Sequence, residues 1–152
     1  MKLDNATIEK NADALRKRKI GIVLCGSFAN VPFGAWALRT VLQRFRALGI
    51  PVGMYVGDSA GCFSAVAAAC GYTELCAASN HIIELTPESI YKFHLLSFLF
   101  HLLSGPSILD DKPLRKFVHG IVNPQKLFNQ ERPDFTKLEI LTTDLDSGDL
   151  VV

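Results

Sequence analysis

A serine lies between two closely spaced glycines in the run Gly57-Asp58-Ser59-Ala60-Gly61. An apolar stretch from Met54 to Val56 precedes this Gly-x-Ser-x-Gly pattern, and small residues suited to a buried helix follow it to about Cys70. This order is typical of a nucleophile elbow, in which a sharp strand-to-helix turn projects the serine hydroxyl above the edge of a sheet. Glycines are needed there because a Cβ would collide with the strand and helix that the turn joins. We therefore predict that Ser59 is a nucleophile.

The helix that begins near Ala60 adds a second feature of such a site. Its free N–H groups and positive dipole end point toward Ser59 and favour an oxyanion there. Gly-x-Ser-x-Gly alone is a weak signal, since glycine, serine and alanine are common residues. The simpler alternative is a tight turn between a strand and a helix with an incidental serine. The chain upstream of the motif, from Ile20 onward, favours the interpretation of Ser59 as a nucleophile.

Upstream of the motif the chain is predicted to form a strand, a break and a helix. Ile20 to Cys25 is a nearly continuous apolar run, as in a parallel strand that is covered on both faces. After a break at Gly26, the helix has Pro32 in its first turn and ends at Gly49, where glycine commonly follows a helix. The apolar positions of this helix form one stripe: Leu38, Val41, Leu42, Phe45 and Leu48.

Two strands that are joined through a helix are expected to be parallel and connected by a right-handed crossover. Their carboxyl ends then lie at the same edge of the sheet, where parallel sheets place their chemistry. We therefore expect the segment that leaves the first strand, Gly26-Ser27-Phe28, to lie on the same side as Ser59.

Weaker patterns flank this unit. Thr7 to Arg18 is predicted to form a surface helix, and Pro87 to Leu103 an almost entirely apolar one. The apolar helix is either part of the core or, alternatively, a lid that contacts lipid. Ser107 to Val118 is predicted to form a turn and a short helix, with Asp110 or Asp111 as its cap.

The last part of the sequence predicts a β-hairpin. Leu138 to Thr142 is a short strand, Asp146-Ser147-Gly148-Asp149 a turn, and Leu150 to Val152 the start of a return strand. A domain rarely stops in the first residues of a hairpin's second strand, because the backbone there would be left unpaired. We therefore expect the natural chain to continue beyond Val152.

The composition indicates one globular domain without a nucleic-acid partner. The chain has 152 residues, of which 49% are hydrophobic and 20% charged, and its net charge is +1. A domain of this length buries about 70% of the surface of its unfolded chain. Near-neutral charge provides no basic face for nucleic acid. The exception is the basic run Arg16-Lys17-Arg18-Lys19, which suits solvent or, less often, anionic lipid.

Neither a signal peptide nor a transmembrane span is predicted. Met1 to Lys19 is polar, and no apolar run approaches the roughly 20 residues that a span needs. These features favour a cytoplasmic or peripheral membrane location. The cysteines, Cys25, Cys62, Cys70 and Cys76, lack metal-ligand or disulfide spacing, and the first three are expected to be buried thiols. No metal or cofactor is expected.

From Ile20 onward, several motifs in order resemble the patatin-like phospholipase family. The family's layout is strand, glycine-rich loop, helix, Gly-Ile-Pro turn, strand and Gly-x-Ser-x-Gly. This chain has a similar layout: a strand into Gly26, the turn Gly49-Ile50-Pro51 and then the serine motif. Leu109-Asp110-Asp111-Lys112-Pro113-Leu114 is similar to the family's Leu-Asp-x-x-Pro-Leu segment, and residues 142–149 to its Thr-Asp-Leu-x-x-Gly hairpin.

The resemblance implies an α/β three-layer sandwich with a mainly parallel sheet, of which residues 20–152 would be one part, after a lead-in of residues 1–19. It also implies a lipid acyl hydrolase that uses a Ser-Asp dyad, without metal or cofactor, on a lipid or membrane-surface substrate. Ser59 would be its nucleophile. The remaining positions of the oxyanion loop and the elbow would be Gly26, Ser27, Phe28, Gly57, Asp58, Ala60 and Gly61.

Two departures from the family pattern leave the activity open. The family's Gly-Gly-Gly-x-Arg-Gly loop is Gly26-Ser27-Phe28-Ala29-Asn30-Val31 here, so only the first glycine is kept. The family's base belongs to an Asp-Gly-Gly or Asp-Gly-Ala motif, and this sequence contains no Asp-Gly pair. Asp144, Asp146 and Asp149 belong to the predicted hairpin and are expected to be structural. The chain is then either a piece of an acyl hydrolase without its base or a pseudoenzyme that binds lipid or protein.

A third hypothesis is an ordinary α/β-hydrolase esterase, which also uses Gly-x-Ser-x-Gly. That class needs a His-Gly-Gly-type loop upstream of the serine and a catalytic histidine in a late loop. The sequence has neither in a recognisable form. Its histidines are His81, His94, His101 and His119. The acyl chain, the head group and the oligomeric state are left open.

Overall fold

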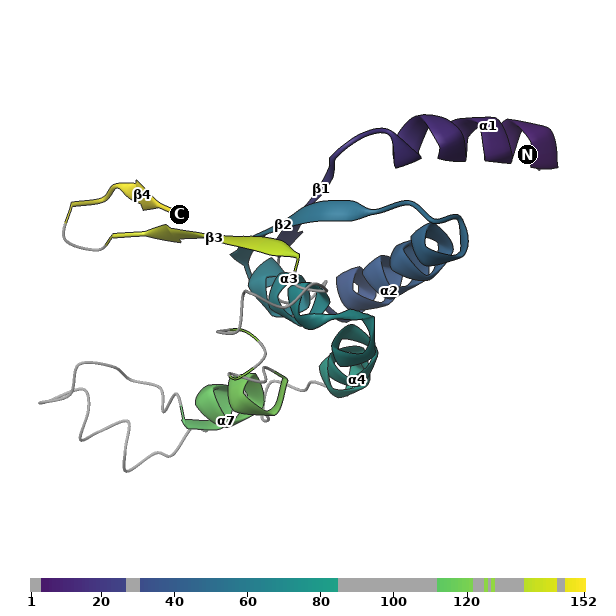
Figure 1. Ribbon diagram of the computed structural model, residues 1–152. Coiled ribbons are helices and arrows are strands. Elements are labelled where there is room, and N and C mark those ends of the chain that lie inside the picture. The colour runs from purple at the N-terminus through teal and green to yellow at the C-terminus, as the bar shows by residue number, and fades with distance from the viewer. Residues whose placement is uncertain are drawn as a thin grey trace, which may run out of the picture.

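The computed structural model contains a sheet of three parallel strands followed by one antiparallel strand (Figure 1). It describes residues 4–26, 31–84, 112–121, 125, 127, 136–144 and 147–152. The strands follow the chain order across the sheet: β1 (Ile20–Gly26), β2 (Val52–Ser59), β3 (Lys137–Thr143) and β4 (Leu150–Val151). The protein is therefore an α/β fold with an open, mostly parallel sheet, as the sequence predicts.

The helices α2 (Val31–Ala47), α3 (Gly61–Cys70) and α4 (Tyr72–Ile83) lie together on one face of the sheet (Figure 1). Helix α7 (Lys112–Ile121) contacts α3 and α4 on the side away from the strands, and α1 (Asn5–Arg16) extends away from the sheet. A second helical layer is not present in the described part of the chain. The three-layer arrangement therefore stays a prediction.

The strand–helix–strand unit of the sequence is confirmed, including the end of its helix. Gly49 has a φ of +63°, and the N–H of Ile50 donates to the carbonyl oxygen of Phe45 at 2.8 Å. The N–H of Gly49 donates to the carbonyl oxygen of Arg46 at 3.1 Å. This pair of bonds is a Schellman motif, which ends α2 and turns the chain into β2.

Helix α1 begins two residues before the predicted start because Asp4 caps it. The Asp4 carboxylate accepts a hydrogen bond from the N–H of Thr7 at 2.7 Å, which satisfies one free donor of the first turn. At the other end, the Nε of Arg16 donates to the carbonyl oxygen of Leu48 at 2.7 Å. Arg16 therefore links the lead-in to the turn that ends α2.

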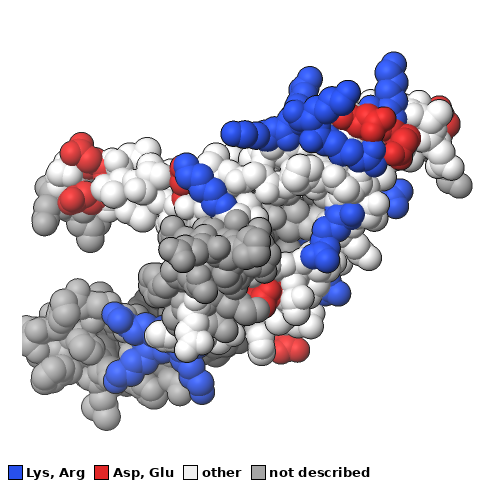
Figure 2. Space-filling view, in the orientation of Figure 1, with Lys and Arg blue, Asp and Glu red and all other residues white. Residues whose placement is uncertain are grey.

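Basic side chains gather over α1 and the start of β1, with acidic side chains among them (Figure 2). Arg16 forms ion pairs with Glu9 and Asp13. Lys17 and Lys19 are exposed. The basic run is thus a solvated lead-in to β1 in this structure.

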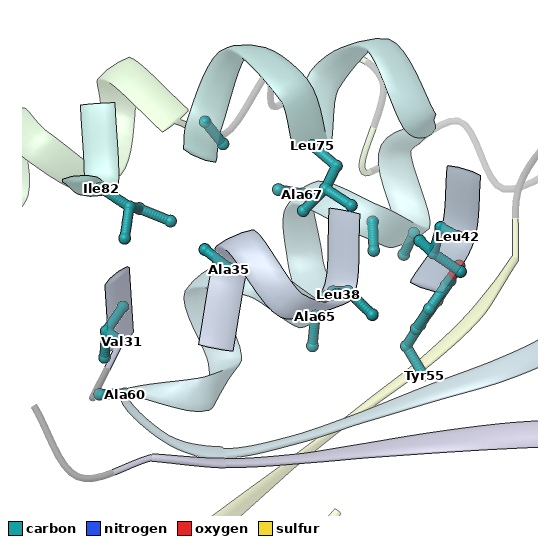
Figure 3. Close-up of a cluster of buried hydrophobic side chains, with 13 residues drawn as sticks. Val31, Ala35, Leu38, Leu42, Tyr55, Ala60, Ala65, Ala67, Leu75 and Ile82 are labelled. Atoms are coloured by element: carbon teal, nitrogen blue, oxygen red, sulfur yellow. The ribbon is translucent and has the colours of Figure 1, made fainter. Parts of the chain in front are cut away.

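The core lies between the sheet and the three helices that cover it (Figure 3). On α2, the buried stripe contains Leu38 and Leu42, as predicted, but continues toward the helix start through Ala35 and Val31. The prediction that Val41 belongs to this stripe is wrong, because its side chain is 42% exposed. The helix is rotated so that its smaller residues face α3 and α4.

The prediction that β1 is covered on both faces is also wrong. Its residues alternate between half-buried and exposed, and the Val23 side chain is 62% exposed. Cys25, expected to be a buried thiol, is exposed on the same face as Val23, whereas Cys62 is half-buried and Cys70 is buried. The reason is that β1 is the outer strand of the described sheet and that the described helices cover only its other face.

Helix α4 was not predicted from the sequence. Its buried face consists of Leu75, Ala78, Ser79 and Ile82, which are spaced as on one side of a helix. Two of these four are small, so the apolar pattern is weak. The hydroxyl of Ser79 donates to the carbonyl oxygen of Leu75 at 2.6 Å, which explains how a serine is tolerated in the core.

The C-terminal hairpin is confirmed. Thr143 pairs with Leu150 across the antiparallel strands β3 and β4. The predicted apolar helix from Pro87 to Leu103 lies outside the described residues, as do the capping positions Asp110 and Asp111. No helix within the described ranges is long and apolar enough to cross a membrane.

Two neighbouring isoleucines of α4 test this packing. Ile82 is fully buried and Ile83 is 50% exposed. Ile82→Ala is expected to lower the free energy of unfolding by about 2–5 kcal/mol, because it leaves a cavity among packed side chains. Ile83→Ala is expected to change it by no more than about 0.5 kcal/mol. Urea unfolding followed by circular dichroism measures both, and equal losses would contradict the assigned helix face.

Candidate active site

Ser59 is the last residue of β2 and has a left-handed backbone conformation. Its φ is +51°, and it is the only non-glycine residue with a positive φ in the described part of the chain. This conformation costs a residue with a side chain about 1–3 kcal/mol. Directly after it, Ala60 is the N-cap of α3. The strand-to-helix kink that the sequence predicts at Ser59 is therefore present.

The glycines around Ser59 are required by close contacts. A Cβ on Gly57 would lie 2.8 Å from the Cα of Cys62 and 3.0 Å from the Cβ of Ala65, so it would push α3 off the strand. A Cβ on Gly61 would overlap the backbone carbonyl of Leu24 in β1. Both glycines of the Gly-x-Ser-x-Gly motif thus have the steric function that the sequence predicts.

Gly26 brings the end of β1 to the same place. Its Cα pairs with that of Ser59 in the register of the two parallel strands. A Cβ on Gly26 would lie 2.8 Å from the carbonyl carbon of Ala60. The segment that leaves β1 therefore starts beside Ser59, as expected. Ser27 and Phe28, the other predicted oxyanion positions, lie outside the described residues.

The first turn of α3 faces this serine with free donors. No side chain caps the helix N-terminus, and the N–H of Phe63 donates to the carbonyl oxygen of Ala60 at 3.4 Å, so Gly61 and Cys62 supply the N–H groups without a backbone partner in the described part of the chain. The Ser59 side chain is exposed and makes no hydrogen bond within the described ranges. An exposed hydroxyl next to free N–H groups and a positive helix end suits attack on a carbonyl and stabilisation of the resulting oxyanion.

Cys62, three residues after Ser59, does not compete as a nucleophile. Burial raises the pKa of the Cys62 thiol, and the nearby Asp58 carboxylate raises it further. A thiol with a raised pKa stays protonated at neutral pH and reacts slowly, because the thiolate is the reactive form. Burial, with a smaller contribution from Asp58, thus keeps this sulfur inert, and sequence reasoning missed the contribution of Asp58. One signal for this contribution was present in the sequence, namely that Asp58 lies four residues before Cys62.

The described residues do not supply a base for Ser59. Asp144 uses one carboxylate oxygen to accept a hydrogen bond from the N–H of Ser147 at 3.1 Å, which holds the hairpin turn. His81 and His119 are exposed, and no hydrogen bond joins either to Ser59 in the part that the structure describes. The same part contains no cluster of metal-ligating side chains. The Asp144 carboxylate therefore has a structural contact in the hairpin turn, whereas Asp146 lies outside the described residues and the structural role of Asp149 stays a prediction.

A scan against models of protein families, a search of curated proteins and a search of solved structures each found no match to this chain. The function must therefore be argued from the residues and geometry around Ser59.

The close contact at Gly61 can be tested by adding one methyl group. Gly61→Ala is expected to destabilise the protein by about 3 kcal/mol or more, because its Cβ meets backbone atoms that cannot rotate away. Gly34→Ala in α2 is the control, since no atom from another described element lies within 4 Å of its Cβ position. That change should stabilise α2 by about 0.5–1 kcal/mol. Denaturant unfolding of both variants measures the difference, and a tolerated Gly61→Ala would contradict the contact.

The strain at Ser59 gives a second test. Ser59→Gly is expected to be more stable than Ser59→Ala by about 1 kcal/mol, because only glycine adopts a positive φ without a steric penalty. Thermal and urea unfolding of the two variants provide the comparison. At an unstrained position the order would be reversed, since alanine restricts the unfolded chain more than glycine does.

Proposed function

We propose that Ser59 is the nucleophile of a serine lipid acyl hydrolase of the patatin-like type. The observation that carries the proposal is the left-handed backbone of Ser59 at the end of β2, with an exposed hydroxyl beside the start of α3. The patatin-like three-layer arrangement is part of this proposal and rests on the resemblance of the motifs.

The chemistry would be acyl transfer in two steps. The Ser59 oxygen attacks the ester carbonyl carbon and loses its proton to an aspartate base, and the leaving alcohol takes up a proton as the acyl-enzyme forms. Water then attacks the acyl-enzyme and releases the fatty acid and the free serine. The N–H groups at the start of α3 and in the segment after Gly26 would bind the negatively charged oxygen in both steps.

The aspartate of this scheme comes from the family resemblance. The resemblance places it in an Asp-Gly-Gly or Asp-Gly-Ala motif, and the 152 residues contain no Asp-Gly pair. The arrangement supports the proposal through the nucleophile and the oxyanion donors, which are independent of the base.

A second candidate is a module that binds lipid or protein without turnover. It is favoured by the sequence after β1, in which only Gly26 remains of the glycine-rich loop. Loss of a single oxyanion donor typically costs an acyl hydrolase about 2.7–4 kcal/mol of transition-state stabilisation. A loop that no longer presents its N–H groups would therefore leave a folded but nearly inactive protein.

A fluorophosphonate probe separates the two candidates. In the full-length natural protein, the hydrolase proposal predicts covalent labelling that maps to Ser59 by mass spectrometry and is lost in Ser59→Ala. It also predicts release of fatty acid from lysophospholipid by the unmodified protein only.

Ser64→Ala is the matched control, because Ser64 lies in the next turn of α3 but is buried. Its labelling should equal that of the unmodified protein. If a folded full-length protein neither labels at Ser59 nor releases fatty acid, the hydrolase proposal is wrong and the binding module is favoured.

A further inference from the structure

A pocket lies toward the end of β2 that is opposite to Ser59. It has a volume of about 330 Å³ and is formed by the end of α2, the start of β2, the end of α3 and the start of α4. Its walls include apolar side chains such as Leu42, Phe45 and Val52. Tyr55, the lining residue of β2 nearest to the serine, precedes Ser59 by four residues, which is roughly 13 Å along the strand. The pocket is therefore distinct from the candidate active site.

A buried hydroxyl lines this pocket without a hydrogen-bond partner among the described residues. Tyr55 is only 4% exposed, and its hydroxyl makes no hydrogen bond within the described part of the chain. Burial raises the pKa of Tyr55 to about 12, so the group is a neutral phenol that can donate one hydrogen bond. Figure 3 shows the Tyr55 ring rising from β2 with its oxygen beside Leu42 of α2. Buried hydroxyls normally have partners, so this one indicates a missing polar ligand atom or a water.

A guanidinium group lies on the same side of α2. Arg46 lines the same pocket one helical turn after Leu42, and its side chain is exposed. Its guanidinium lies 4.8 Å from the centre of the Tyr72 ring, and it forms no ion pair or hydrogen bond with any residue that the structure describes. Stacking on the ring fixes the orientation of the guanidinium and leaves its N–H groups for an anion.

The start of α4 forms another wall of the pocket, and its charges favour a ligand with one small anionic group. Helix α4 begins at the pocket with Gly71 as its N-cap and no side-chain cap, which adds a positive dipole end. Glu74 in the first turn of that helix also lines the pocket and offsets part of this potential. A doubly charged phosphate is therefore less suited than a single carboxylate. The lining as a whole is more polar than apolar and includes Thr73 and Thr136, but the side chains of Leu42, Phe45 and Val52 suit an attached hydrocarbon chain or ring.

We propose that this pocket binds a small amphiphilic carboxylate, with the carboxylate on Arg46 and Tyr55 and the apolar part against Leu42, Phe45 and Val52. Arg46 would pair with the carboxylate through two N–H groups, and the Tyr55 hydroxyl would donate a further hydrogen bond. The proposal does not depend on the hydrolase function of Ser59.

Octanoate, below the concentration at which it aggregates, is a suitable probe, with 1-octanol as a neutral molecule of equal chain length. Isothermal calorimetry and amide NMR shifts measure the binding. Octanoate is expected to bind saturably, with shifts at Val52 and Tyr72, and at least about tenfold more tightly than octanol because only octanoate carries the charge. Equal affinities, or no saturable binding, would overturn the proposal.

Three variants locate the site. Arg46→Gln should weaken octanoate binding about tenfold or more, and Tyr55→Phe, which removes only the hydroxyl, about threefold to tenfold. Arg44→Gln is the control: Arg44 is also a basic residue in the last turn of α2 but does not line the pocket, and its change should leave the affinity unaltered.

The positions of the amide shifts distinguish this pocket from the candidate active site, because octanoate in the pocket should shift Val52 and Tyr72 and leave Gly57 and Cys62 unaltered. Shifts centred on Gly57 and Cys62, or binding insensitive to Arg46→Gln and Tyr55→Phe in folded variants, would place the ligand elsewhere and refute the site.

Discussion

The contact between the end of β1 and the first turn of α3 is the constraint on which the rest of the structure depends. At Gly61 a Cβ would overlap the Leu24 carbonyl, and at Gly26 it would lie 2.8 Å from the carbonyl carbon of Ala60. Both neighbours are backbone groups, so no change of rotamer can make room. The contact draws the start of α3 against β1 although α3 follows β2 in the chain. Ser59 is thereby held at the junction of two strand ends and a helix start, and its direction is set by backbone atoms.

The strained backbone conformation of Ser59 also depends on the packing of residues that do not contact it. The left-handed conformation of Ser59 is retained only because the elements on either side cannot shift. Helix α3 is almost entirely buried, and its small residues, among them Ala65 and Ala68, allow it to approach the sheet closely. On its other side, Leu75 and Ile82 of α4 are fully buried in the same core. The packing of α4 thus contributes to holding Ser59, although α4 supplies no residue to the site.

The sequence predictions succeeded where a feature is determined by a few neighbouring residues and failed where it depends on distant elements. The elbow was predictable because two glycines, a serine and a run of small residues within one short segment admit few backbone paths. The end of α2 at Gly49 is equally local. The coverage of β1 was mispredicted because an apolar residue such as Val23 does not indicate which elements lie over it. Helix α4 was missed because Ala78 and Ser79 give almost no hydrophobic contrast, so only its partners reveal its buried face.

The strain at Ser59 also bears on the choice between a hydrolase and a binding module. Glycine or asparagine would adopt the same backbone conformation at lower cost, so the fold alone gives no reason for a serine at this position. A module that only binds lipid or protein would gain stability by losing the side chain. An acyl hydrolase, in contrast, needs this hydroxyl raised above the sheet and close to the N–H groups of α3. The strain is therefore better explained by a reacting serine than by a binding surface.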